Sequence, residues 1–240
     1  MKTLARKHSL VAALLFSLFM LGGCATIEGE ADPDDPLESF NRAMYTFNDE
    51  LDKAILKPVA QGYNAVLPDP VNKGVSNFFN NLEDVVVIFN DLLQLKIEQA
   101  LSDIGRVFFN STLGIAGIFD VATSMDMPKH NEDFGQTLGY WGVGTGAYIV
   151  WPFLGPSNVR DTVGLVSDAY VNPLYDIKSR GTQNTLIVVN VIDQRAGLLS
   201  ASKILKEAAL DPYLFVRDAY LQRRQNLVYD GNPPKEDFDK

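Results

Sequence analysis

The stretch DPLESFNRAMYTFNDELDKAIL (35–56) predicts the fold class of this 240-residue chain. Asp35 and Pro36 form a helix-start signal, because aspartate is favoured at the N-cap and proline at the first helical position. Glu38 stands where a capping box needs it. The apolar residues that follow recur every three or four positions, which is the period of one helix face. They are Leu37, Phe40, Met44, Phe47, Leu51 and Ile55. We expect an amphipathic helix that ends at Pro58.

The same start signal, Asp followed by Pro, recurs at Asp69 and Asp211. Hydrophobic periodicity predicts further helices over 70–80, 83–95, 97–110, 157–171, 183–210 and 212–228. The β-branched runs VVVIF (85–89) and LIVVNVI (186–192) have strand propensity. No regular alternation separated by turns surrounds them, so we interpret them as buried or lipid-facing helix. The sequence therefore predicts an all-α domain over 36–229, followed by a polar, flexible tail over 230–240.

One long segment has no charged residue and is unusually rich in glycine and aromatic residues. It reads FGQTLGYWGVGTGAYIVWPFLGPSNV (134–159). Its glycines and prolines would leave backbone groups unpaired in lipid, so it is not a transmembrane helix. We expect a loop that is packed in protein, lines a cavity or rests at a membrane interface, and we expect no spanning helix in the mature chain.

The first 23 residues predict a secretory signal peptide. A basic start is followed by the apolar run 10–21 and by two glycines before Cys24. The run is shorter than the ~20 residues that a spanning helix needs. LGGC (21–24) resembles the lipobox of bacterial lipoproteins, in which the cysteine carries a diacylglycerol on sulfur and an N-acyl chain such as palmitate. Residues 24–35 would then be an acylated tether. Ala25 after the cysteine favours sorting to the outer membrane.

Composition excludes several function classes. Cys24 is the one cysteine of the chain, so its use as an anchor leaves no disulfide, thiolate nucleophile or cysteine metal site. Without the three basic residues of the signal, 18 basic side chains face 30 acidic ones. So acidic a protein is a poor nucleic-acid binder, because phosphate contacts need clustered Lys and Arg. We expect membrane contact through apolar faces and acyl chains.

No catalytic, metal or cofactor site is predicted, and we expect no enzyme. GVGTGA (142–147) fits a dinucleotide fingerprint, but Pro152 stops the helix that should follow it. No G-x-S-x-G elbow or H-E-x-x-H motif is present. We interpret His130 as a solvated loop histidine. Arg160 and Asp161 follow Ser157, an expected N-cap. We interpret them either as a surface ion pair or as an anchor for a loop or a lipid headgroup.

Four segments, at 35–49, 106–122, 134–164 and 211–224, together resemble the MlaA (VacJ) family of outer-membrane phospholipid-transport lipoproteins. The pattern F-G-x-T-L-G…G-V-G-x-G…Y-x-x-x-P-F-x-G-x-x-x-x-R-D carries most of the resemblance. Ala147 stands where the family usually has proline, and 173–200 matches weakly.

The resemblance implies a compact ring of amphipathic helices in the inner leaflet, with an amphipathic channel through it. It implies removal of phospholipid mislocalised in the outer leaflet and its transfer to a soluble periplasmic carrier. It also implies association with a trimeric porin and no covalent chemistry. The competing hypotheses are a structural envelope lipoprotein without transport activity and a phospholipase.

The candidate site residues follow from these predictions. Candidate channel or loop residues are Gly135, Gly139, Gly142, Gly144, Gly146, Tyr148 and Pro152. Candidate lipid contacts of the first helix are Phe40, Asn41, Met44 and Phe47. The apolar members of this second set are equally good core residues, and periodicity does not separate the two roles. Arg160 and Asp161 are the candidate loop anchor, and Cys24 is the lipid anchor.

Overall fold

The computed structural model describes residues 35–234. The expected signal peptide (1–23), the anchor Cys24 and the end of the tail (235–240) lie outside the described residues, so these stay predictions. Helix dominates, and the described part of the chain holds one two-stranded sheet, which confirms the all-α class. In chain order the elements are α2 (Glu38–Leu51), the π-helical turn η1 (Asp52–Leu56), α3 (Lys57–Val66), α4 (Asp69–Leu93), α5 (Ile97–Thr112), the 3-10 turn η2 (Ala122–Met125), α6 (Phe134–Tyr140), β1 (Tyr148–Trp151), β2 (Gly155–Asn158), α7 (Val159–Val171), the 3-10 turn η3 (Pro173–Asp176), α8 (Arg180–Gly197), α9 (Leu199–Ala208) and α10 (Pro212–Val228).

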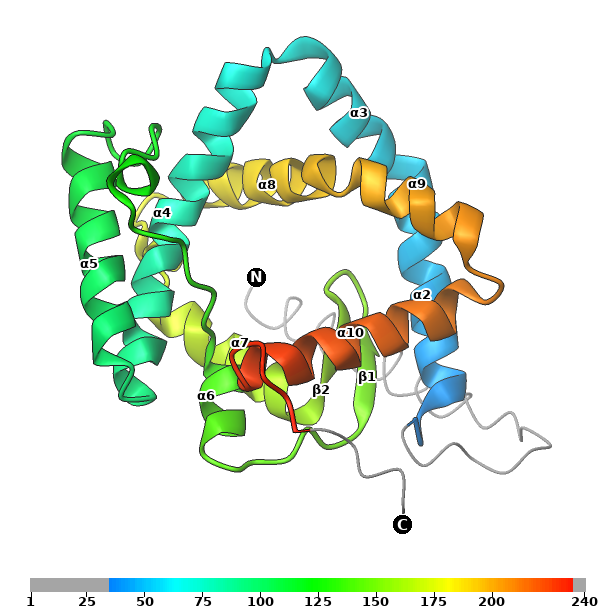
Figure 1. Ribbon diagram of the computed structural model, residues 1–240. Helices are drawn as coiled ribbons and strands as arrows, with labels where there is room; N and C mark the ends of the chain where they lie inside the picture. The colour runs from blue at the N-terminus through cyan, green and yellow to red at the C-terminus, as the bar shows by residue number, and fades with distance from the viewer. Residues whose placement is uncertain (1–34, 235–240) are drawn as a thin grey trace, which may run out of the picture.

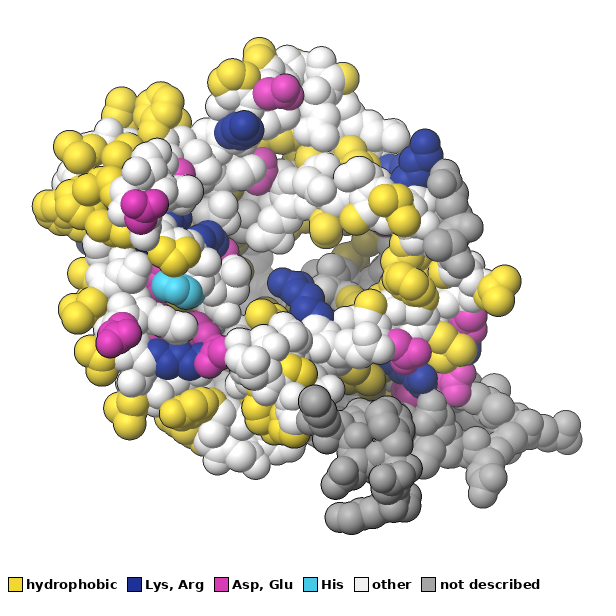
Figure 2. Space-filling view, viewed as in Figure 1, with side chains coloured by type: hydrophobic (Ala, Val, Ile, Leu, Met, Phe, Trp, Pro, Cys, Tyr) yellow, Lys and Arg dark blue, Asp and Glu magenta, His cyan; other side chains and the backbone are white. Residues whose placement is uncertain are grey.

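The helices are arranged around a ring (Figure 1). Helix α4 packs along α5, α6 along α7, and α3 along α8, while α2 packs against β1. Helix α10 runs beside the hairpin and reaches α6, which closes the ring. Figure 2 shows the ring hollowed at its centre. The expected ring of helices is confirmed, and within residues 35–234 no helix has both the length and the hydropathy to cross a bilayer.

The first helix does not end at Pro58. It continues from α2 through η1 into α3, whose second residue is Pro58. At the end of η1 the N–H of Lys57 donates to the carbonyl of Asp52, five residues back. A π-helical turn is wider than an α-helical one. It leaves room for the proline ring, which in a regular helix clashes with the carbonyl four residues earlier.

Asp35 does not cap α2, which begins without a side-chain cap. Asp35 is buried, and its carboxylate accepts hydrogen bonds from Asn41 Nδ2 at 2.7 Å and from the hydroxyl of Tyr213. These bonds join the start of α2 to α10, so a tertiary contact uses the group that the local pattern assigned to a cap. Asp211 does cap α10, accepting from two backbone N–H groups of the first turn.

The helices expected over 70–80 and 83–95 are a single helix, α4. Asn81, at the expected break, is buried, and its Nδ2 donates to Ser111 Oγ of α5 at 3.0 Å. Asparagine has low helix propensity on its own. The bond to α5 offsets that preference, so the helix runs through.

The helix expected over 183–210 is two helices, α8 and α9, which separate at Leu198. Helix α8 lies across the ring and is tied to two other helices by one carboxylate. Asp193 accepts from Tyr63 Oη of α3 at 2.9 Å and from Ser76 Oγ of α4 at 2.8 Å. The segment that matched its relatives weakly therefore braces the ring.

Helices α5 and α7 turn polar side chains inward and apolar side chains outward. On α5 the buried residues are Ala100, Asp103, Arg106 and Asn110. The exposed apolar residues of α5 are Ile97, Leu101, Ile104 and Phe108. On α7 the buried residues are Arg160, Asp161 and Gly164. The exposed apolar residues of α7 are Val159, Val163, Leu165, Val166 and Tyr170. Figure 2 shows hydrophobic side chains gathered over the outer side of α5. A surface helix of a water-soluble protein has the opposite polarity.

Candidate functional site

Residues 134–164 fold into a helix, a short loop, a hairpin and a second helix, which corrects the expectation of a loop. Asp133 caps α6 by accepting a backbone N–H of the first turn at 2.8 Å. Asn158, not Ser157, caps α7 by accepting the N–H of Asp161 at 2.7 Å. The strands between them pair antiparallel, from Tyr148 opposite Asn158 to Trp151 opposite Gly155.

Helices α6 and α7 cross where two glycines meet. A Cβ on Gly164 would lie 2.4 Å from the backbone nitrogen of Gly135, so no side chain fits there. A Cβ on Gly135 would lie 2.5 Å from Asp161 Oδ1. The glycines therefore let the first turns of both helices approach the same point on α10.

Four charged residues meet at that point, and we call them the charge cluster: Asp133, Arg160, Asp161 and Arg224. Arg160, Asp161 and Arg224 are buried, and Asp133 is half-buried. Arg224 of α10 places Nη1 2.5 Å and Nη2 2.8 Å from the two oxygens of Asp133, and Nη2 also lies 3.0 Å from Asp161 Oδ1. Arg160 Nε lies 3.0 Å from the same oxygen of Asp161. Tyr220 donates its hydroxyl to Asp161 Oδ2 at 2.7 Å. The cluster joins α6, α7 and α10.

Pairing overcomes the cost of burial in this cluster. Burial by itself raises the pKa of Asp133, but the hydrogen bonds and charge of Arg224 hold it below its usual range. Burial by itself lowers the pKa of Arg224, but the hydrogen bonds and charge of Asp133 raise it above its usual range. Both groups are therefore ionised at neutral pH. Arg160-Asp161 is a buried part of this cluster, which corrects its interpretation as a surface ion pair.

Two asparagines of α2 hold the hairpin in place. Asn41 Nδ2 donates to the carbonyl of Tyr148 at 3.0 Å, and its Oδ1 accepts the N–H of Val150 at 2.8 Å. Asn48, two turns later, bonds the hairpin turn in the same way. Its Nδ2 donates to the carbonyl of Trp151 at 2.9 Å, and its Oδ1 accepts the N–H of Phe153 at 2.8 Å. Asn41 is fully buried, so the expectation that it contacts lipid is wrong.

The large apolar candidates of α2 and the hairpin divide between core and surface. Tyr148 is buried beside Tyr213, and Met44 packs against them. Phe47 is exposed and meets the ring of Phe153 edge-on, with the centroids 5.4 Å apart. The remaining two are half-buried: Phe40 and Pro152. Tyr148 thus belongs to the core of the hairpin and not to a channel wall.

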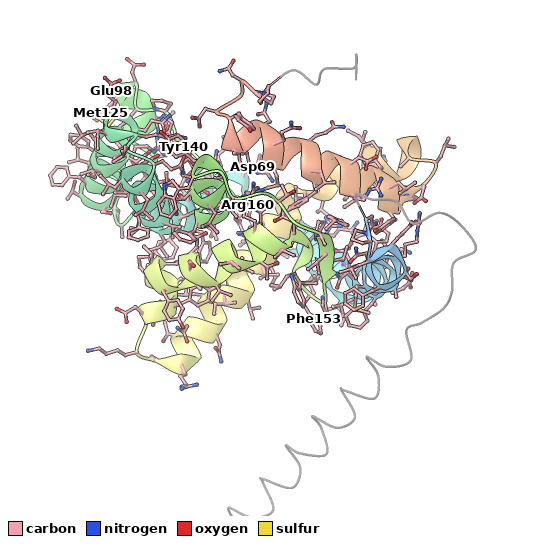
Figure 3. All side chains as sticks on the ribbon, turned by 90° about the horizontal axis from the view of Figure 1, so that it is seen from below. Asp69, Glu98, Met125, Tyr140, Phe153 and Arg160 are labelled. Atoms are coloured by element: carbon pink, nitrogen blue, oxygen red, sulfur yellow. The ribbon has the colours of Figure 1, made fainter. Side chains whose placement is uncertain are left out.

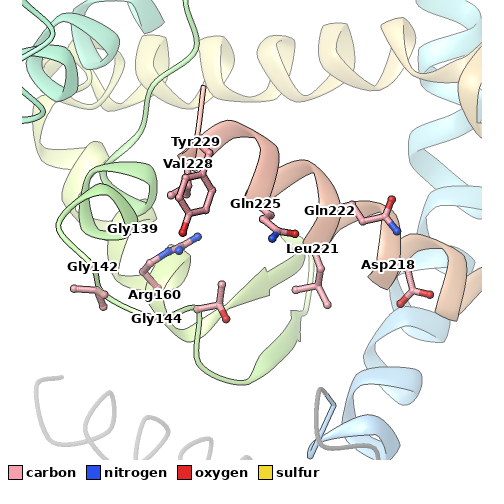
Figure 4. Close-up of a pocket in the computed structure, with 12 residues that line it drawn as sticks. Gly139, Gly142, Gly144, Arg160, Asp218, Leu221, Gln222, Gln225, Val228 and Tyr229 are labelled. Atoms are coloured by element: carbon pink, nitrogen blue, oxygen red, sulfur yellow. The ribbon is translucent and has the colours of Figure 1, made fainter. Parts of the chain in front are cut away.

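A pocket of about 520 Å³ opens between the loop after α6 and one face of α10 (Figure 4). The residues of α10 that line it recur every three or four positions; they are Asp218, Leu221, Gln222, Gln225 and Val228, and Tyr229 lines it directly after the helix. The opposite side is formed by Gly139, Gly142, Val143, Gly144 and Thr145, with Arg160 of α7. Gly142 has φ +90°, a conformation that glycine adopts without strain. Three of the candidate glycines therefore line one pocket, whereas Gly135 and Gly146 pack against protein.

Arg160 reaches the pocket through a gap that Gly139 leaves open. A Cβ on Gly139 would lie 2.8 Å from Arg160 Nη1. The backbone N–H of Arg160 donates to the carbonyl of Thr145 at 3.1 Å, which ties the loop to α7. At Ala147 the backbone carbonyl accepts the N–H of Val159 at 3.1 Å, a bond that proline could equally accept. Figure 3 shows Arg160 near the middle of the molecule and Phe153 toward its periphery.

A second buried group of acidic residues lies between α4 and α5, and no sequence pattern predicts it. Asp91 and Asp103 are fully buried, and among the described residues no donor reaches either oxygen of Asp91. Burial, and then the neighbouring carboxyl of Asp103, raise the pKa of Asp91 to about 8. His130 Nδ1 lies 2.8 Å from Asp103 Oδ2 and is half-buried, so its interpretation as a solvated histidine is wrong. Residues 35–234 contain no group of three potential ligands that could hold a metal ion.

The fold and the pocket define a class of protein: an all-α ring in which α5 and α7 expose apolar side chains and bury polar ones, with a buried arginine beside its pocket. The chain belongs to the MlaA lipoprotein family, whose model matches residues 33–227.

Relatives in this family are similar over nearly their whole length. The intermembrane phospholipid transport system lipoprotein MlaA of Escherichia coli is 37% identical, and the match covers 92% of this chain and 89% of that protein. The protein of the same name from Haemophilus influenzae is 33% identical, over 94% of this chain and 92% of that protein. A chain solved under the heading "Structural basis for maintenance of bacterial outer membrane lipid asymmetry" superposes with a TM-score of 0.72. It is 35% identical, over 81% of this chain and 98% of the solved one.

Proposed function

We propose that this protein is an outer-membrane lipoprotein of intermembrane phospholipid transport. It takes phospholipid that is mislocalised in the outer leaflet and passes it to a soluble periplasmic carrier for return to the inner membrane. Two of the relatives are named for phospholipid transport, and the related structure concerns outer-membrane lipid asymmetry. Transport moves a lipid without breaking a covalent bond, so the protein is not an enzyme and needs no cofactor.

The reversed polarity of α5 and α7 carries this proposal. A water-soluble monomer rarely exposes large contiguous apolar patches. Leu101 and Phe108 of α5 are 64% and 60% exposed, and Tyr170 of α7 is 89% exposed. Around a ring embedded in one leaflet, these side chains contact acyl chains. The inward polar faces meanwhile lower the desolvation cost of a headgroup that passes through.

The anchor places the ring. Acyl chains on Cys24 hold the chain at the inner leaflet of the outer membrane, because two or more chains give stable binding where one does not. Asp35 is the eleventh residue after Cys24, and a chain of eleven residues spans at most ~40 Å. The ring therefore stays at the leaflet to which the anchor is attached, beside a trimeric porin and within reach of the periplasmic carrier.

The test uses a strain of Escherichia coli that lacks its own MlaA. The readout is the phospholipid of intact cells that added phospholipase digests. The wild-type chain should lower it, and Cys24→Ala should not. The double variant Leu101→Lys/Phe108→Lys should fail because it places two charges on the lipid-facing side of α5. Glu98→Lys, at an exposed and already charged position of the same helix, is the matched control and should work.

Three outcomes would contradict the proposal. The first is wild-type protein that leaves surface phospholipid unchanged at normal expression. The second is a fully active Leu101→Lys/Phe108→Lys variant, which would mean that the outer face of α5 does not meet lipid. The third is lysophospholipid or free fatty acid as the product, which would indicate a phospholipase.

A further inference from the structure

Arg160 brings a buried hydrogen-bond donor without an acceptor to the pocket. Its side chain is 4% exposed, and its Nη2 has no hydrogen-bond partner among the described residues. Buried donors are almost always paired, and an unpaired one calls for an explanation. Arg160 is also one of the residues that line the pocket between the glycine loop and α10. An acceptor that enters the pocket would satisfy this donor.

The charges around Arg160 leave it only partly compensated. Arg160 forms an ion pair with Asp161, through Nε at 3.0 Å. The carboxylate of Asp161 is shared, because Arg224 and Tyr220 also donate to it. Asp133 is taken by both Nη groups of Arg224. Among the described residues, Nη2 of Arg160 is therefore the guanidinium nitrogen left without an acceptor, and an anion could supply one.

The pocket suits a small anionic group attached to apolar chains. Figure 4 shows the guanidinium at the end of the pocket that Val228 and Tyr229 form, with Asp218 at the opposite end. Asp218 pairs with Arg217 Nε at 2.9 Å, and no ion pair joins Asp218 to Arg160 among the described residues. Gly144 leaves open space beside the pocket, because a Cβ placed on it would meet nothing within 4 Å.

We propose that this pocket binds a phosphate group through Arg160, and that the phosphate is the phosphodiester of a phospholipid headgroup. Guanidinium and phosphate form charge-assisted hydrogen bonds that are about twice as strong as neutral ones. Gly139 is the residue that lets Arg160 reach the pocket, and apolar Val143 and Leu221 in the lining offer contact to the glycerol backbone and the first carbons of the chains. The inference deepens the proposed function and rests on it for the choice of a lipid as the source of the phosphate.

The experiment uses the full, acylated chain purified in a non-ionic detergent that lacks phosphate. Native mass spectrometry measures adducts with dihexanoyl-phosphatidylglycerol and with dihexanoylglycerol, which has the same chains but no phosphate. Inorganic phosphate is added as a competitor. The variants are Arg160→Gln, which removes the donor, and Gly144→Leu, which fills the pocket from its open side. Arg223→Gln, a neighbouring exposed arginine of α10, is the charge-matched control.

Wild type and Arg223→Gln should bind the phospholipid and not dihexanoylglycerol. Arg160→Gln and Gly144→Leu should each weaken phospholipid binding at least tenfold. For Arg160→Gln, a tenfold loss is about what one charge-assisted hydrogen bond contributes. Displacement by inorganic phosphate only at high excess would identify the lipid as the source. Displacement at equal concentration would overturn the lipid assignment. Gly144→Leu does not touch the charge cluster, so it tests the pocket even if Arg160→Gln unfolds.

Unchanged phospholipid binding in both variants, or equal binding of dihexanoylglycerol, would overturn the inference. The failures of the two proposals differ. Arg160-dependent binding in a protein that leaves surface phospholipid unchanged would keep the phosphate site and reject transport. Active transport with binding that does not depend on Arg160 would keep transport and reject the site.

Discussion

Replacement of Arg224 by glutamine should strongly destabilise the ring. Arg224 donates three hydrogen bonds to the carboxylates of Asp133 and Asp161. Glutamine removes the positive charge and leaves the buried carboxylate of Asp161 and the half-buried carboxylate of Asp133 with less compensation. Breaking a buried ion pair from one side costs ~3–5 kcal/mol. For a domain of this size 1 kcal/mol shifts the midpoint of thermal unfolding by ~2–4 °C, so we expect a decrease of about 10 °C.

The assay is thermal unfolding followed by far-UV circular dichroism in non-ionic micelles. Arg223→Gln is the matched control, because Arg223 is the adjacent residue of α10 and is exposed. It should change stability by less than ~0.5 kcal/mol. The double variant Arg224→Gln/Asp133→Asn should recover part of the loss, since a neutral amide needs no cation. Equal midpoints for the two arginine variants would refute the reasoning.

The pH dependence gives the sign of the same interaction. Because the pKa of Asp133 is lowered in the folded state, its pairing stabilises the protein above pH ~4. That contribution is lost as the pH falls through the lowered pKa. The difference between wild type and Arg224→Gln should therefore shrink below pH 4. A difference that stays constant from pH 7 to pH 3 would show that the loss comes from packing and not from charge.

Three further predictions concern stability and use the same unfolding assay. Asn41→Leu leaves the hairpin groups at Tyr148 and Val150 without partners and should cost ~2–4 kcal/mol; a loss below 1 kcal/mol would contradict the two-bond clamp. Asp91→Asn should raise the unfolding midpoint at pH 7 and change it little at pH 4. The pKa of Asp91 is raised in the folded state, so the folded carboxyl keeps a proton that the unfolded one loses above pH ~4. Wild-type stability therefore falls as the pH rises from 4 toward 8. Equal changes in the midpoint at pH 7 and pH 4 would contradict this prediction. Gly164→Ala should destabilise by at least ~2 kcal/mol because its Cβ would lie 2.4 Å from a backbone nitrogen. Gly181→Ala is the control, since nothing lies within 4 Å of its Cβ, and it should be neutral or stabilising. Similar losses of stability in Gly164→Ala and Gly181→Ala would contradict the close contact between α6 and α7.

Local signals predicted the helices well where tertiary contacts did not compete. Asp211-Pro212 starts α10, whose side-chain cap is the one the sequence indicates. The same signal at Asp35 does not act as a cap, because Tyr213 and Asn41 bind that carboxylate from other positions of the fold. Pro58 was expected to end a helix, but a π-helical turn absorbs its ring.

The candidate site was predicted in part. Composition identified the glycine-aromatic segment, and three of its glycines line the pocket. Periodicity could not show that Asn41 is a hydrogen-bonding residue within an otherwise apolar stripe. It also could not bring Asp91 of α4 next to Asp103 of α5, because that pairing depends on how two helices pack.

The sequence by itself determined the helical class and the start of most helices, because both depend on residues close together in the chain. It also determined the family resemblance, because the motifs depend on residue order alone, while the lipoprotein signal stays a prediction. Only the tertiary structure decided which face of each amphipathic helix points outward. On α5 and α7 that face is the apolar one, a choice that depends on what surrounds the ring and not on the period of the helix. The structure also decided that Arg160 ends buried beside a pocket, because Gly139 leaves the gap through which its side chain passes.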